Sequence, residues 1–262
     1  MEIQFDTTIL TLPSGREITM KESNGEEDAA LSRVGDVQQN LHFPRFLSLV
    51  VVADSFIGNR TPDFDYISTE WRPNDILAAI LYWRIWTYGK EMNFKHTFSS
   101  DLNKLEISFL QDLTEYLVDY KKYHSLTEKE DKIKFLASVP SNAIPPYDIP
   151  QISEIELQIR ENLRVKYTLS NWLAGKELVG RKAVEDINDN DMLLMHNISA
   201  SLDDKPYMPM NTFGILKSPE KKSILKSIRA NDKNMDLTVE VTHPNTKAKE
   251  ELPLIQMEDF LG

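Results

Sequence analysis

The stretch from Arg72 to Phe109 reads RPNDILAAILYWRIWTYGKEMNFKHTFSSDLNKLEISF and holds the densest aromatic cluster of the chain. Apolar residues cover more than one side of its first half, which is typical of a helix buried in its own core. A proline at the start and Gly89 at the end predict a helix over Pro73–Tyr88. We therefore expect its tyrosines and tryptophans to form core rather than a ligand-binding box.

Alternation of apolar and polar residues predicts β-hairpins on both sides of this helix. Residues 91–98 and 104–109 alternate after Gly89 and are typical of two paired strands. Near the start, residues 10–20 alternate around a Pro-Ser-Gly turn, as expected for a half-buried hairpin. The central helix is thus expected to lie between a first and a second hairpin.

Most of the remaining first half is predicted to be helical. Asn24 and the acidic residues after it predict a helix that begins near Gly25, because acidic side chains suit the positive end of a helix dipole. A second helix is predicted over residues 44–57, a loop over residues 58–73, and helical spacing returns over residues 110–126.

A change in composition predicts the division of the chain. Four prolines fall within residues 139–151, which is typical of a linker or an extended crossover. We therefore predict an N-terminal hairpin-helix half at residues 1–125, a proline-rich linker at 126–151 and a C-terminal hairpin-helix half at 152–262.

The second half repeats the order of the first. Residues 152–171 again give a strand, a polar turn, a strand and a Ser-Asn pair, and a further helix is predicted over residues 218–232. Several residues match at a constant offset of 147: Leu10 with Leu157, Ile18 with Val165, Asn24 with Asn171, and His96 with His243. The sequence therefore predicts an α+β fold of two related halves by internal duplication, each half with β-hairpins and several helices.

Charge and composition limit the classes of partner. The chain has 41 acidic and 30 basic residues, so its net charge of −11 argues against nucleic acid or an anionic membrane surface and favours a basic protein. The absence of cysteine excludes disulfides and thiolate metal sites. No basic segment followed by an apolar run opens the sequence, and we expect a soluble, cytosolic protein.

Sequence motifs of catalysis are missing. The chain has no dinucleotide-binding, phosphate-binding-loop, zinc-protease or serine-hydrolase motif, and its histidines never fall three or four residues apart. His96 and His243 would together supply only two metal ligands. We therefore expect no enzyme activity, no metal, no cofactor and no small-molecule substrate. The alternative is an enzyme with an unrecognised carboxylate site, for which Asp203 and Asp204 with Glu185 are the candidates, and it requires facing carboxylates of raised pKa in a cleft.

Three segments carry a resemblance to a known family. They are LPSGREITMKE at residues 12–22, NDILAAILYWRIWTYGKEMNF at 74–94 and HPNTKAKEELPLIQMEDF at 243–260. In this order they resemble the baseplate hub assembly proteins of T-even-type contractile-tailed bacteriophages. Many members carry cysteine pairs near the places where this chain has His96 and His243, so any zinc site of the relatives is not carried over.

The resemblance implies a role in phage tail morphogenesis, as a baseplate hub subunit or as a chaperone of hub assembly. The partners would be phage tail or baseplate hub proteins. The location would be the host cytoplasm during assembly, and the virion tail baseplate if the protein is retained.

Two segments are predicted to bind a partner. One is residues 59–71, which end at Trp71, and the other is residues 207–216, which mix methionine, proline and aromatic residues in a loop too apolar for a solvated linker. The predicted contact residues are Trp71, Tyr207, Met208, Met210 and Phe213.

Overall fold

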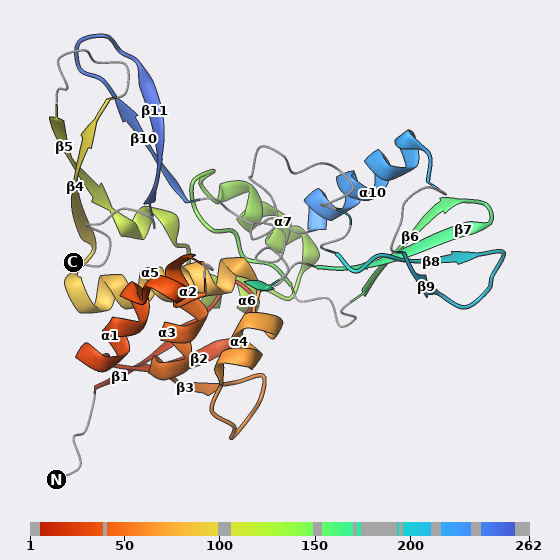
Figure 1. Ribbon diagram of the computed structural model, residues 1–262, viewed down its shortest axis with the longest axis horizontal. Helices are drawn as coiled ribbons and strands as arrows, with labels where there is room; N and C mark the ends of the chain where they lie inside the picture. Colours follow the sequence, from red (N-terminus) through yellow and green to blue (C-terminus); the bar gives the residue numbers. More distant parts are fainter. Residues whose placement is uncertain are drawn as a thin grey trace.

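The fold is α+β, as the sequence predicts. The computed structural model describes residues 6–38, 41–98, 106–148, 154–169, 172–173, 193, 196–210, 216–231 and 237–254. In these residues the strands pair antiparallel in four small sheets, and helices pack beside them (Figure 1).

The first sheet has the order β1-β2-β3, with strands Thr7–Thr11, Glu17–Lys21 and Val51–Asp54. Its hairpin β1-β2 confirms the predicted strand, turn and strand. Helix α3, His42–Val50, ends earlier than predicted because the chain becomes extended at Val51 and pairs with β2. The β-branched residues at positions 51 and 52 suit this strand, which the predicted helix over 44–57 overran.

Five helices form the first part of the described chain, and the other four each contact α3. They are α1 (Gly25–Ser32), α2 (Val34–Gln38), α3, α4 (Phe64–Glu70) and α5 (Pro73–Tyr88). The predicted α1 and α5 are confirmed, and Asn24 closes a capping box at the start of α1. Helix α4 lies where a loop was predicted; Asp63 caps it by accepting a hydrogen bond from the Tyr66 N–H at 2.8 Å.

Two hairpins and three short helices follow these elements. The hairpins are β4-β5 (Glu91–Thr97 with Glu106–Asp112) and β10-β11 (Thr238–Thr242 with Lys249–Pro253). The short helices are η1 (Leu113–Tyr116), α6 (Tyr120–Ser125) and α7 (Lys129–Ser138). The hairpin after α5 is confirmed. The helical spacing expected from residue 110 begins only at Leu113, because β5 continues to Asp112.

The second sheet has the order β6-β7-β8-β9, with strands Glu154–Arg160, Leu163–Thr168, Ser199–Leu202 and Met208–Pro209. Helix α10, Ser218–Asn231, packs against it through Ile224, Leu225 and Ile228. The helix predicted after Asn171 lies outside the described residues except for residues 172–173, which are helical.

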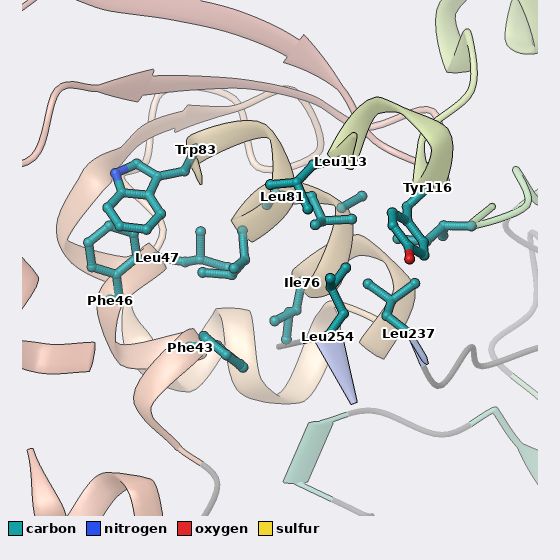
Figure 2. Packing of buried hydrophobic residues seen from close by; sticks show 14 of the residues in the cluster. Phe43, Phe46, Leu47, Ile76, Leu81, Trp83, Leu113, Tyr116, Leu237 and Leu254 are labelled. Atoms are coloured by element: carbon teal, nitrogen blue, oxygen red, sulfur yellow. The ribbon is translucent and has the colours of Figure 1, made fainter. Parts of the chain in front are cut away.

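The hydrophobic core divides the chain differently from the predicted halves. Leu237, Val239, Val241 and Leu254 of the C-terminal hairpin belong to the core of the first part, not to that of the second sheet. Figure 2 shows Leu237 and Leu254 beside residues of α5 and η1. The predicted boundary at 152–262 is therefore corrected: the last hairpin packs with the first part because its apolar face completes that core.

The proline-rich segment is also not a free linker. Ile144 is fully buried in the first core and donates a backbone hydrogen bond of 2.9 Å to Tyr116 O. Tyr147 donates one of the same length to Pro13 O. Residues 126–151 also contain α7. The prolines correctly predicted an extended segment. Ile144, which lies between them, packs in the core and holds the segment against the first part.

Part of the order of elements recurs in the described residues. A hairpin, a strand paired to it, a helix and a final hairpin occur as β1-β2, β3, α5 and β4-β5 and as β6-β7, β8, α10 and β10-β11, with α1 to α4 inserted in the first series and β9 in the second. The strand register repeats as well: Ile9 faces Thr19 in the first sheet, and Glu156 faces Lys166 in the second, at the same offset of 147. The predicted duplication stays a prediction.

Candidate interaction surface

The LPSGR turn between β1 and β2 is held by a buried polar cluster. Arg16 is 3% exposed and forms an ion pair with Asp54. Its guanidinium donates a hydrogen bond of 2.5 Å to the Tyr66 hydroxyl and lies 4.5 Å from the ring centre of Phe56. Buried charges are stable only when they are paired and hydrogen-bonded, and Asp54 also accepts from the Phe56 N–H at 2.9 Å. This cluster fixes the turn onto the fold.

A second buried carboxylate holds the same turn from α5. Asp75 accepts hydrogen bonds from the Ser14 N–H at 3.0 Å and from the Tyr147 hydroxyl at 2.8 Å. Burial raises the pKa of Asp75 above its ordinary value, and the nearby positive charge of Arg16 opposes that rise. The LPSGR segment therefore has a structural role: it joins β1-β2, α5 and the segment around Tyr147.

Trp71 is part of this cluster, which corrects its predicted role in partner binding. Its side chain is fully buried, and its indole N–H donates a hydrogen bond of 3.2 Å to Asp54. The sequence placed it at the end of an exposed loop because α4 was not recognised. Once α4 forms, its C-terminal end carries Trp71 back into the core.

The other predicted contact residues are divided between surface and core. Met208 in the edge strand β9 is 71% exposed, whereas Met210 is 8% exposed and belongs to the second core. Tyr207 is half-buried, and its ring lies 4.3 Å from the ammonium group of Lys166. Phe213 lies outside the described residues. Of the predicted contact residues that the structure describes, Met208 is thus the exposed one, with the half-buried Tyr207 beside it.

The two long hairpins contact each other through histidines. The His96 Nε2 lies 2.8 Å from Glu250 Oε2, and the ring of Phe98 stands edge-on between His96 and His243, at 4.9 and 4.8 Å. His243 Nδ1 accepts from the backbone N–H groups of Asn245 and Thr246. No three potential metal ligands come together in the described part of the chain. This junction is an aromatic contact where the hairpins meet.

The carboxylates proposed for an enzyme site lie at an exposed turn. Asp204 is paired with Arg164, and its side chain is 88% exposed; Asp203 accepts a hydrogen bond of 2.9 Å from the Asn162 side chain. Glu185 lies outside the described residues. Asp203 and Asp204 therefore do not form the cleft with facing carboxylates that the enzyme alternative requires.

The outer faces of the two sheets differ sharply at equivalent positions. In the second sheet, neighbouring strands place Glu156, Lys166 and Ser199 in one row, and the Lys166 ammonium lies 3.9 Å from the Glu156 carboxylate. Such a charged row is typical of a sheet face in contact with water.

The matching row of the first sheet is Ile9, Thr19 and Ala53. Ile9 is 72% exposed, and Val52, the extra residue of a bulge beside Ala53, is 38% exposed. We call the surface of Ile9, Thr19, Val52 and Ala53 the Ile9 face. Sequence reasoning missed it, although comparing the two halves at the offset of 147 would have shown that Ile9 and Thr19 correspond to Glu156 and Lys166.

Comparisons with known proteins do not identify the chain. No protein-family model, curated protein or solved structure matches it. None of the helices in the described ranges is long and apolar enough to cross a lipid bilayer.

Proposed function

We propose that this chain is a non-enzymatic assembly protein of phage tail morphogenesis, a baseplate hub subunit or a chaperone of hub assembly, that acts through protein–protein contacts. The observation that carries a binding role is the Ile9 face. An exposed isoleucine on a sheet whose duplicate has an ion pair at the same position favours a face that a partner covers.

Charge supports a basic partner surface. Glu17 is exposed on the same side of β2 as Thr19, so an acidic group borders the Ile9 face, while Lys21 on that side forms an ion pair with Glu27. Complementary charges at the rim of an interface steer association, while the apolar centre supplies most of the affinity. The phage context comes from the resemblance of the three sequence segments.

Quantitative mass spectrometry of purified phage particles beside the infected-cell lysate tests the role. A fixed small copy number in particles is expected for a hub subunit, and abundance in the lysate with absence from particles is expected for a chaperone. The Ile9→Glu variant should lower the yield of complete tails, whereas Glu156→Gln on the second sheet should leave it unchanged. Normal tails from phage that lack this protein would overturn the proposal.

A further inference from the structure

The outer edge of β1 is open. In the described residues β1 pairs with β2 alone, and Asp6 O accepts a hydrogen bond from the Glu22 N–H. Bonded and non-bonded pairs alternate in an antiparallel ladder, so Thr7, Ile9 and Thr11 direct their backbone groups away from β2. No described backbone group bonds to them on that side. The edge therefore offers the N–H and C=O groups of these residues to a further strand.

The other edge strands of the described residues carry features that block such pairing. Natural sheets protect their edges with charged side chains, prolines or bulges. Strand β3 has a bulge and ends with Asp54, and β9 ends with Pro209. Charged side chains occur on β4, β5, β6, β10 and β11. Strand β1 reads TTILT and has no charge, proline or bulge. Among the described edges, β1 is thus the one that is chemically ready to accept another strand.

We propose that a partner protein adds an extended segment to the edge of β1, in antiparallel orientation, and so enlarges the first sheet beside the Ile9 face. This inference rests on the binding role proposed above and specifies how the partner is held. Backbone bonds to Thr7, Ile9 and Thr11 supply the pairing, as in other cases of strand addition. Facing residues of paired strands lie on the same side of a sheet, so a β-branched apolar residue opposite Ile9 covers part of its exposed side chain.

Asp6 sets a second requirement for the added segment. It is exposed and has no ion-pair partner among the described residues. It lies three residues before Ile9, and its side chain is therefore on the opposite face of the strand. In an antiparallel segment, the residue that faces Asp6 follows the residue that faces Ile9 by three positions. A lysine or arginine there pairs with Asp6 across the strands. The net charge of −11 also favours a basic segment over a second copy of this chain.

Nuclear magnetic resonance of the full chain with a capped synthetic peptide tests the proposal. The peptide Thr-Val-Ile-Thr-Thr-Lys has its isoleucine and lysine at the required spacing. It is added up to about 5 mM, because a single added strand is a low-area contact. The amide signals of Thr7, Ile9 and Thr11 should shift, and their hydrogen exchange should slow several-fold. The amides of Thr8 and Leu10 face β2, and their exchange should change little.

Exchanging the charges gives a matched control. The same peptide with glutamate in place of lysine should bind the wild type roughly twofold to fivefold more weakly. The Asp6→Lys variant should reverse this preference and bind the glutamate peptide more tightly. A reversal of this kind requires that the peptide lies in the proposed register, whatever the stability of the variant.

A proline substitution tests the backbone bonds. Thr7→Pro removes one outward N–H at the first position of an edge strand, where proline is tolerated. It should weaken binding of the lysine peptide about fivefold, the effect of one hydrogen bond. Thr7→Ala keeps the N–H and should bind like the wild type. Unchanged amide signals outside β1 verify that each variant is folded.

The possible results separate this inference from the proposed function. A peptide that shifts no β1 amide would overturn strand addition, and so would protection of these amides in the protein alone that rises with its concentration, which would assign the edge to a second copy. Fewer complete tails from Ile9→Glu without any peptide effect on β1 would mean that the partner covers the Ile9 face without adding a strand. Peptide binding together with normal tails from phage that lack the protein would support the strand-addition site and overturn only the phage role.

Discussion

Ile9 and Glu156 occupy the same position in two hairpins that lie 147 residues apart, yet Ile9 is exposed and apolar while Glu156 lies beside Lys166. Both rows lie on the outer face of their sheets, so neither side chain contributes to a core. The fold of the hairpin therefore accepts an isoleucine or a glutamate at this position. The difference between the two residues indicates that the two outer faces have different surroundings.

The first prediction concerns the ion pair beneath the LPSGR turn. Asp54→Ala should lower the free energy of unfolding by about 3–5 kcal/mol, because it leaves the charge of Arg16 buried without its partner. Asp131→Ala removes an exposed pair with Lys134 and should cost about 0–1 kcal/mol. Urea unfolding measures both values, and equal losses would contradict the structural role given to Asp54.

The second prediction concerns the conformation of the same turn. Gly15 has a φ of +83°, and a Cβ atom there would lie 2.8 Å from the His124 ring. Gly15→Ala should therefore destabilise the protein by about 1–3 kcal/mol through backbone strain and steric contact. Gly35→Ala is the matched control, since its Cβ meets nothing within 4 Å. Thermal unfolding should show a lower Tm for the first variant only.

The third prediction concerns the dependence of stability on pH. Burial raises the pKa of Asp75 in the folded state, so its favourable contribution is fully present below the unfolded-state pKa and is lost as pH rises through the folded-state pKa. Asp75→Asn keeps the shape and cannot ionise. Its stability relative to the wild type should therefore increase as pH rises from about 4, the ordinary carboxyl value.

Urea unfolding of wild type and Asp75→Asn at a series of pH values measures this difference directly. Titrations shared by the two proteins cancel when one free energy is subtracted from the other. A difference that does not change with pH would show that Asp75 titrates at the same pH in the folded and unfolded chain.

The fourth prediction concerns the junction of the two long hairpins. Phe98 is 1% exposed and contacts the rings of His96 and His243, so Phe98→Ala should cost about 3–5 kcal/mol. Limited proteolysis should then cut the C-terminal hairpin faster than in the wild type. Leu110→Ala, at a position that is 62% exposed on β5, should change neither stability nor cleavage. Slow cleavage of both variants would mean that Phe98 does not hold the hairpins together.

Local signals in the sequence were enough for the main elements. Helix α5 could be predicted from apolar residues on most of its sides and from the glycine that follows it. In the structure this residue, Gly89, has a φ of +88°, which ends the helix. The hairpins follow from alternation and turn residues, and α4 was missed because its seven residues are too few to show a helical period. The offset of 147 is visible in the sequence and recurs in the hairpin register, where Ile9 faces Thr19 and Glu156 faces Lys166.

The sequence by itself thus determined the α+β class, the helix α5 and the hairpins, since each depends on residues close together in the chain. Only the tertiary structure decided that Trp71 is buried, that the segment around Ile144 is strapped to the core, and that the last hairpin completes the first core. It also showed that the Ile9 face remains exposed. These features depend on which distant apolar surfaces fit together, and no local pattern of residues records that fit.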